Sequence, residues 1–129
     1  MKILLDTCAL LWWTLDPQQL SENCQETLNK SESLWVSSIS IWELGVKIKN
    51  KKLQIPLGFE SYVKKLQQLN SLEILPVDLP IWLGNLTLDW PHRDPADRTI
   101  VATAKHIDAY ILTSDQRICA YYAKTLSVR

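Results

Sequence analysis

Glycine and phenylalanine are both scarce in this sequence. Of its 129 residues, three are glycine and one is phenylalanine. The glycine-rich loops that cradle phosphates need closely spaced glycines, and neither GxxxxGK[ST] nor GxGxxG occurs. A phosphate-binding loop of this kind is therefore not expected. The aromatic content lies instead in six tryptophans, which are often used at interfaces.

Cysteine is also sparse, and its spacing does not suggest metal binding. Cys8, Cys24 and Cys119 are an odd number of residues without a CxxC pair. They therefore predict neither a zinc site nor a disulfide framework. We expect reduced, mostly buried thiols, as in a cytosolic protein.

Long apolar runs are missing as well. The longest early run covers residues 9–13, which is too short to span a membrane or to form the apolar part of a signal peptide. The sequence therefore predicts a soluble, cytoplasmic protein that does not associate with membranes.

Neither sign of charge is in excess. Fourteen Lys and Arg residues balance fourteen Asp and Glu residues, so a nucleic acid would have to be met by a local basic patch. An apolar content of 47% and a charged content of 22% are typical of a globular protein. The length predicts a single domain over residues 1–129 that can bury a core.

Short apolar segments alternate with amphipathic segments along the chain. Strands are expected at residues 2–5, 33–38, 73–77, 110–113 and 126–128. Helices are expected at residues 9–15, from Ser21 past Leu28, from Ser38 or Ser40 to about residue 50, and at 59–69, 79–86, 95–107 and 115–122. Helices between successive strands imply parallel pairing through right-handed crossovers. We therefore predict a three-layer α/β/α fold with four to five strands.

Four carboxylates are predicted to gather at one edge of this sheet. Asp6 follows the first strand and Asp115 follows the strand at 110–113, so both lie at carboxyl ends of strands, where functional groups of parallel sheets collect. Glu43 and Asp97 share helix stripes with apolar residues, which points them toward the core. Because acids are rarely buried unless paired, one cation-binding site would account for all four.

Such an oxygen-rich site is typical of Mg²⁺ or Mn²⁺. A metal ion there lowers the pKa of bound water and stabilises phosphate oxygens during in-line attack. Each acid taken alone also has a structural interpretation, as a helix cap, a turn residue or a residue of a first helical turn. For Asp94, which precedes Pro95 at a predicted helix start, capping is the preferred interpretation.

Four segments occur in an order and spacing typical of one family: LLDTCALLWW, SSISIWELGVK, HRDPADRTIVATA and ILTSD. The chain resembles PIN-domain proteins, and within these it looks most like the VapC-type toxins of bacterial toxin–antitoxin pairs. The resemblance covers nearly the whole chain, and HRDPADRTIVATA is its most specific part. It implies an α/β/α fold with a mostly parallel sheet and an Mg²⁺- or Mn²⁺-dependent ribonuclease activity.

Matching positions imply roles for individual residues. The implied metal-binding and catalytic acids are Asp6, Glu43, Asp97 and Asp115. Thr7 and Thr113 match hydroxyl positions beside the first and last acids, where they are expected to hydrogen-bond a carboxylate or a metal-bound water. His92 and Arg93 are candidates for contact with substrate phosphates; for His92, packing in the loop beside Trp90 and Pro91 is an equally favoured interpretation. The chain departs from the family at Cys8, where closely similar sequences often carry histidine.

The resemblance also implies partners. These are an RNA substrate, a cognate antitoxin whose tail enters the acidic groove, and a second copy of the chain in a homodimer. Trp12, Trp13 and the stripe at 59–69 are interpreted either as partner-facing surface or as core. The candidates for contact with the RNA backbone are Lys47, Lys49, Lys51, Lys52 and Arg93. For most of these lysines, a solvated helix face is the preferred interpretation.

Two other interpretations stay open. The first is a PIN-like binding module without catalysis, against which the presence of all four acids argues. The second is an Asp-based phosphotransfer domain. Its haloacid-dehalogenase form requires DxD, whereas this chain has Asp6-Thr7-Cys8, and a receiver domain requires a further acid near the first strand and a late strand-end lysine, neither of which is evident.

Overall fold

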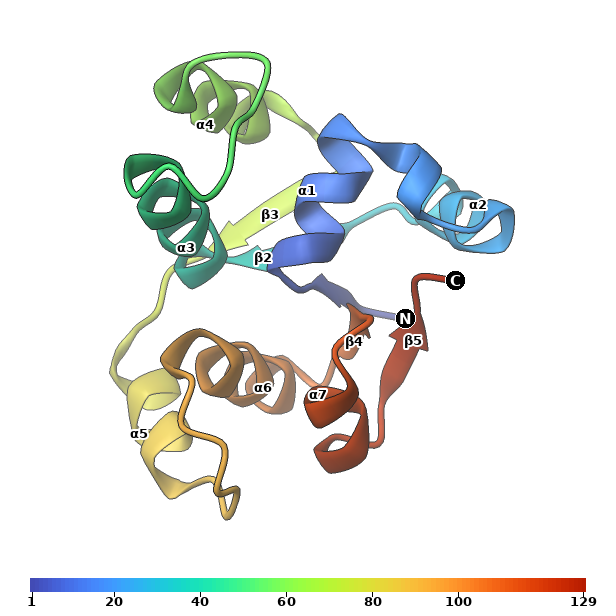
Figure 1. Cartoon of the computed structure of the whole chain (residues 1–129). Helices are drawn as coiled ribbons and strands as arrows, with labels where there is room; N and C mark the ends of the chain where they lie inside the picture. The colour runs from blue at the N-terminus through green and yellow to red at the C-terminus, as the bar shows by residue number, and fades with distance from the viewer.

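Five parallel strands form the centre of the protein (Figure 1). The computed structural model describes residues 1–129. The strands lie in the order β3-β2-β1-β4-β5, and every neighbouring pair is parallel. Their bounds are β1 (Ile3–Leu5), β2 (Leu34–Ser37), β3 (Leu72–Leu75), β4 (Tyr110–Thr113) and β5 (Thr125–Ser127).

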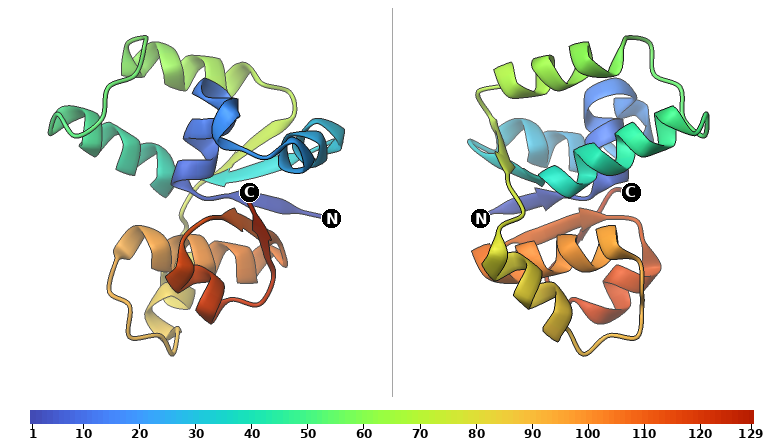
Figure 2. Two further views of the ribbon diagram at one scale, coloured as in Figure 1. Left: turned by 45° about the vertical axis from the view of Figure 1, so that its right-hand side comes forward. Right: turned by 90° about the vertical axis from the view of Figure 1, so that its left-hand side faces the viewer.

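Helices cover both faces of the sheet (Figure 2). Helices α1 to α4 pack on one face, α6 and α7 pack on the other, and α5 lies against α6. This arrangement confirms the predicted three-layer α/β fold. None of the helices is long and apolar enough to cross a membrane. Their bounds are α1 (Thr7–Leu15), the short 3-10 helix η1 (Pro17–Gln19), α2 (Glu22–Lys30), α3 (Ser38–Lys49), α4 (Phe59–Gln68), α5 (Leu79–Thr87), α6 (Pro95–Ile107) and α7 (Gln116–Tyr121).

The central strand β1 contributes to two separate cores. Ile3 and Leu5 point into the larger core under α1 to α4, whereas Leu4 points into the smaller core under α6 and α7. All three side chains are fully buried. Burial on both faces explains why β1 is a continuous apolar run without polar alternation.

The chain changes direction within the sheet at β1. It runs outward from β1 through β2 to β3, and then crosses back to β4 on the other side of β1. In parallel sheets, the loops beyond the strand ends diverge at such a point and leave a crevice in which ligands bind. Asp6 lies in this crevice, just past the end of β1. Its N–H donates to the carbonyl of Leu112 in β4 at 3.1 Å.

The cap of α3 differs from the prediction. Neither Ser38 nor Ser40 caps this helix; the Oγ of Ser37 accepts the N–H of Ile39 at 3.1 Å instead. The reason is that β2 continues to Ser37 and passes into α3 without a loop. Ser40 is fully buried inside the helix, where its hydroxyl accepts a hydrogen bond from Thr7.

The cysteines are less buried than predicted. Cys24 is buried, but Cys8 and Cys119 are both exposed, and all three are free thiols. The prediction of mostly buried thiols is therefore wrong. The two cysteines are exposed because α1 and α7 each pack only one face on the sheet, and Cys8 and Cys119 lie on the faces that remain open to solvent.

Substitution of Leu4 tests the packing of the central strand. Because Leu4 is fully buried, Leu4→Ala should lower the free energy of unfolding by about 3 kcal/mol through lost contacts and a residual cavity. Leu69→Ala is the matched control, because Leu69 is 39% exposed and should cost less than half as much. Chemical denaturation measures both changes, and equal losses would contradict the placement of Leu4 in the core.

Candidate active site

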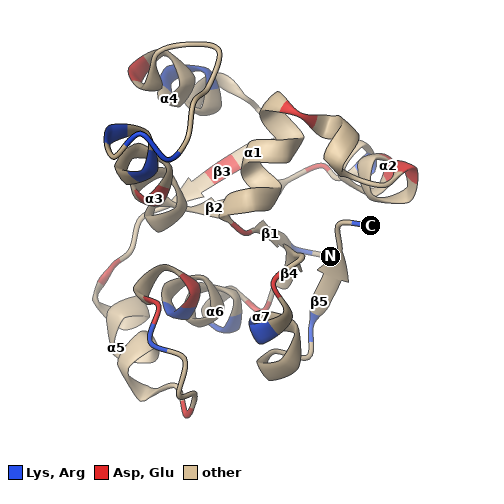
Figure 3. Cartoon of the chain, in the orientation of Figure 1, with Lys and Arg blue, Asp and Glu red and all other residues tan.

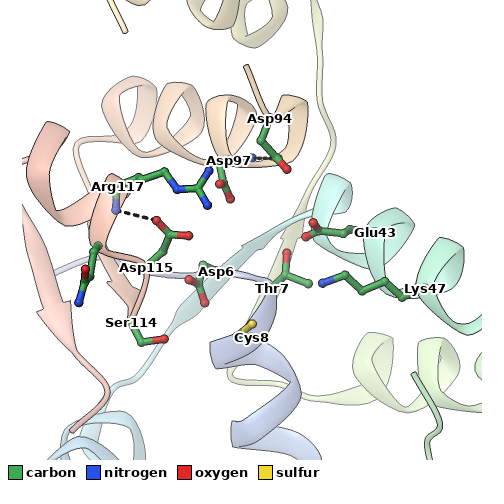
Figure 4. Close-up of a pocket in the computed structure, with 11 residues that line it drawn as sticks. Asp6, Thr7, Cys8, Glu43, Lys47, Asp94, Asp97, Ser114, Asp115 and Arg117 are labelled. Atoms are coloured by element: carbon green, nitrogen blue, oxygen red, sulfur yellow. Dashed lines mark hydrogen bonds between the residues drawn. The ribbon is translucent and has the colours of Figure 1, made fainter. Parts of the chain in front are cut away.

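An acidic pocket opens at the carboxyl ends of β1 and β4 (Figure 4). Its volume is about 640 Å³, and only one of its 11 lining residues is hydrophobic, so the surface that it offers is polar. The structure brings all four predicted acids together in this pocket and adds Asp94. The lining residues are Asp6, Thr7, Cys8, Glu43, Lys47, Asp94, Asp97, Ser114, Asp115, Gln116 and Arg117.

Three of the pocket acids cap helices. Asp6 caps α1, Asp94 caps α6 and Asp115 caps α7. In each acid the Oδ1 oxygen accepts backbone N–H bonds of 2.8 to 3.1 Å, while the second oxygen is not used by the cap. Capping, confirmed here for Asp94, is therefore compatible with binding of a cation by the second oxygen. The positive ends of these three helix dipoles also favour negative charge at the pocket.

Asp6 is the most deeply buried of the pocket acids. It is 6% exposed, and this burial is the main cause that raises its pKa from 3.8 to about 6. Hydrogen bonds from Thr113 and from the Ala9 N–H act to lower the pKa, and the nearby charges of Asp97 and Asp115 act to raise it. The ionised carboxylate is therefore destabilised where it lies, and a bound cation would relieve it.

A histidine holds the Asp97 carboxylate. His92 Nε2 lies 2.7 Å from Asp97 Oδ2, and the two side chains are only 12% and 21% exposed. Burial raises the pKa of Asp97, the hydrogen bond from His92 lowers it, and the charges of Asp94 and Asp115 raise it. The other ring nitrogen, Nδ1, lies 3.4 Å from Nη1 of Arg117. The contact of His92 with substrate phosphate stays a prediction.

Glu43 and Lys47 line the pocket from α3, one helical turn apart (Figure 4). Lys47 is the one predicted phosphate-binding lysine that the fold brings to the acids. The other lysines of this group, Lys49, Lys51 and Lys52, are exposed outside the pocket. Predicted Arg93 is also exposed, and it lines a neighbouring hollow beside α5 and α6.

Arg117 is the charged pocket residue that sequence reasoning missed. It lies in the first turn of α7, on the opposite wall from Lys47, and its backbone N–H bonds to the cap residue Asp115 (Figure 4). The sequence feature that could have identified Arg117 is its position two residues after Asp115. A residue in the first turn after a capping acid lies close to the same strand end as the acid.

The two threonines have different partners. The Thr113 hydroxyl accepts the Asp115 N–H at 2.9 Å and lies close enough to Asp6 to lower the pKa of that carboxyl, so it lies between the acids that follow β1 and β4. Thr7 instead donates to Ser40 at 3.0 Å, which ties α1 to α3. The expected bond from Thr7 to a carboxylate or a metal-bound water stays a prediction.

The donor set fits a hard divalent cation. Carboxylate oxygens are the ligands that Mg²⁺ and Mn²⁺ prefer, and four of them come from separate elements of the fold. No three His, Cys, Asp or Glu side chains lie close enough together to hold one ion as they stand, so the fit rests on the chemistry of the donors and not on their present spacing. The acids repel one another, as the effect of Asp97 and Asp115 on the pKa of Asp6 indicates, and a bound cation would offset this repulsion.

The variant Asp6→Asn tests the electrostatics of the metal-free site. Asparagine keeps a cap oxygen but removes the charge. Since the pKa of Asp6 is raised from 3.8 to about 6, the wild-type protein loses stability as the pH rises through this window, because the unfolded chain ionises first. In EDTA at about pH 7, Asp6→Asn should be more stable than wild type by up to about 3 kcal/mol. The gain should shrink as the pH falls toward about 4, and denaturation across pH measures it. A variant that is less stable than wild type at about pH 7 would contradict the buried charge.

The chain has relatives among known proteins. The family model described as "PIN domain" matches residues 3–124. A curated protein, "Ribonuclease VapC22" from Mycobacterium tuberculosis, is 29% identical over 117 residues, which cover 90% of this chain and 88% of that protein.

Solved structures share the fold. A crystal structure of VapBC2 from Rickettsia felis, bound to a DNA fragment from its promoter, has a TM-score of 0.71 at 19% identity and covers 100% of both chains. A toxin–antitoxin complex from Klebsiella pneumoniae has a TM-score of 0.68 at 15% identity and covers 98% of each chain. The parallel sheet, the acidic pocket at its edge and the family match across residues 3–124 lead to one conclusion: this chain belongs to the PIN domain family.

Proposed function

We propose that this protein is a metal-dependent endoribonuclease that acts as the toxin of a toxin–antitoxin pair. It hydrolyses RNA phosphodiesters with Mg²⁺ or Mn²⁺ held by Asp6, Glu43, Asp97 and Asp115. The observation that carries this proposal is the gathering of these four acids, from separate elements, in one polar pocket. Similarity to Ribonuclease VapC22 over 90% of the chain supports it.

The chain's own residues have distinct tasks in this mechanism. The four acids hold the metal ion, which when bound supplies an activated water and stabilises phosphate oxygens. Thr113 lowers the pKa of Asp6 and so favours its ionised form, and His92 holds Asp97. Lys47 and Arg117 approach the acids from opposite walls (Figure 4). An RNA strand that crosses the pocket therefore meets a positive charge on each side of the acids, an arrangement suited to cleavage within a chain.

The variant Asp6→Asn tests the nuclease proposal. It should lower Mn²⁺-dependent cleavage of RNA by the purified protein by at least about 100-fold, because it removes the charge of a metal ligand. Asp108→Asn is the matched control. The Asp108 side chain is 88% exposed and its φ of 55° suits asparagine, so this variant should keep full activity.

Induced expression in a bacterial host tests the toxin role with the same variants. Wild type and Asp108→Asn should arrest growth, whereas Asp6→Asn should not. Equal toxicity of all three chains would remove Asp6 from the reaction. A wild-type protein without metal-dependent cleavage would favour the alternative of a binding module without catalysis.

An apolar groove supports the proposal of an antitoxin partner. It lies between α1, the loop after α3 and α4, and its volume is about 620 Å³. We propose that an apolar antitoxin segment packs there and continues along α1 to the acidic pocket, where a basic side chain pairs with the carboxylates. The lining residues are Trp13, Thr14, Leu15, Pro56, Leu57, Tyr62, Lys65, Leu66 and Leu69.

An exposed ridge on α5 supports the proposal of a homodimer. The α5 ridge consists of Leu79, Trp82, Leu83 and Leu86, which are 41 to 76% exposed. Their spacing places them on one face of the helix, and α5 carries no charged residue (Figure 3). Exposed apolar patches of this kind mark protein interfaces. We propose that a second copy packs its own ridge against this one in a two-fold dimer.

The variant Leu83→Asp tests this dimer. A charge placed on the ridge would be buried without a partner in the interface, so the chain should elute as a monomer. Leu69→Asp is the control, because Leu69 lines the groove beside α4 and does not belong to the α5 ridge. Light scattering coupled to size exclusion gives the mass of each species. A monomeric wild type, or a Leu83→Asp protein that stays dimeric, would contradict the proposal.

A further inference from the structure

The loop between α5 and α6 carries His92 but has little structure of its own. Residues 88–94 belong to no helix or strand, and no backbone–backbone hydrogen bond involves residues 89–93. His92 nevertheless meets Asp97 at 2.7 Å. Another group must therefore hold the loop in place.

That group is the guanidinium of Arg98. Its Nη1 donates to the carbonyl oxygens of Trp90 and His92, and its Nη2 donates to those of Leu88 at 3.1 Å and Asn85 at 2.7 Å. Its Nε donates to the Asn85 Oδ1 at 3.3 Å. A guanidinium has five N–H hydrogens, and these five bonds use all of them. Arg98 therefore has no donor left for a carboxylate or a substrate phosphate.

Two neighbouring residues of α6 hold His92 by its two ends. Asp97 bonds to the imidazole ring, and Arg98 bonds to the backbone carbonyl at 3.1 Å. The adjacent Trp90 adds support, since its ring stacks on Tyr121 at 4.7 Å and lies 4.9 Å from the His92 ring. The loop is thus shaped mainly by side chains of α6 and α7.

We propose that Arg98 is a positioning residue of the acidic pocket. By holding the carbonyls of Leu88, Trp90 and His92, it sets the His92 ring. That ring in turn holds one oxygen of Asp97 and leaves the other oxygen for the metal ion. This inference rests on the proposed metal-dependent function. Lysine keeps the charge but places its three donors on a single nitrogen. Arg98→Lys therefore releases most of the loop carbonyls without removing the positive charge.

A double-mutant cycle on Mn²⁺ affinity tests the proposal with the full chain. Calorimetry compares wild type, Arg98→Lys, His92→Ala and the double variant. Each single substitution should weaken Mn²⁺ binding by about tenfold, and the double variant should be no weaker than His92→Ala, because Arg98 acts through His92. Arg129→Lys is the matched control. Arg129 donates to the Gln19 carbonyl at 2.7 Å outside the pocket, and its substitution should leave Mn²⁺ affinity unchanged.

Imidazole ¹⁵N–¹H spectra of the protein in EDTA give a second readout that needs no metal. The Nε2 signal of His92 should show a hydrogen-bonded imidazole in wild type and in Arg129→Lys, and should lose that signature in Arg98→Lys. An unchanged His92 signal in Arg98→Lys would overturn the inference. The inference would also be overturned if the losses of Mn²⁺ affinity in the two single variants added up in the double variant. The same holds if Arg98→Lys lowered the melting temperature but left the Mn²⁺ affinity unchanged. A wild type that binds no Mn²⁺ refutes the proposed function, and the spectra then still decide the role of Arg98.

Discussion

The acidic pocket depends on hydrogen bonds between its carboxylates and the helix starts that they cap. Asp6, Asp94 and Asp115 each give one oxygen to the backbone N–H groups of the helix that follows. These bonds position the side chains without help from a ligand and place them where the helix dipoles favour negative charge. Groups that repel one another are thereby kept at one edge of the sheet. For these acids, a structural role and a functional role are compatible, because capping uses only one of the two carboxylate oxygens.

The central strand places a charge where the fold disfavours it. The buried segment Ile3–Leu5 ends directly in Asp6, whose pKa rises to about 6 through burial. Asp6 lies beside the end of β4, because the order of strands changes direction at β1 and places β4 next to it. A residue that costs stability at such a position is typical of a functional site, where activity and stability favour different side chains. The proposed metal ion explains why a carboxylate occupies this place.

Helix α6 connects the pocket to a loop that would otherwise lack support. Asp97 faces the acids, whereas its neighbour Arg98 binds the loop carbonyls of Leu88, Trp90 and His92. His92 joins the two, because it contacts both residues. Local order at the pocket is thus tied to packing between α5, α6 and α7. The two proposed partner surfaces, the groove beside α1 and the α5 ridge, do not include residues of the acidic pocket.

The sequence by itself determined the features that depend on neighbours along the chain or on strand direction. These include the strand at 110–113, the caps Ser21 and Asp94, and the gathering of four acids at the edge where parallel strands end. Only the tertiary structure decided that Ser37 caps α3, that Cys8 is exposed, that Arg117 enters the pocket, that Arg98 binds loop carbonyls, and that the α5 ridge faces solvent. The physical reason is that periodicity and capping involve residues a few positions apart, whereas exposure and side-chain partners depend on which faces of distant elements pack together.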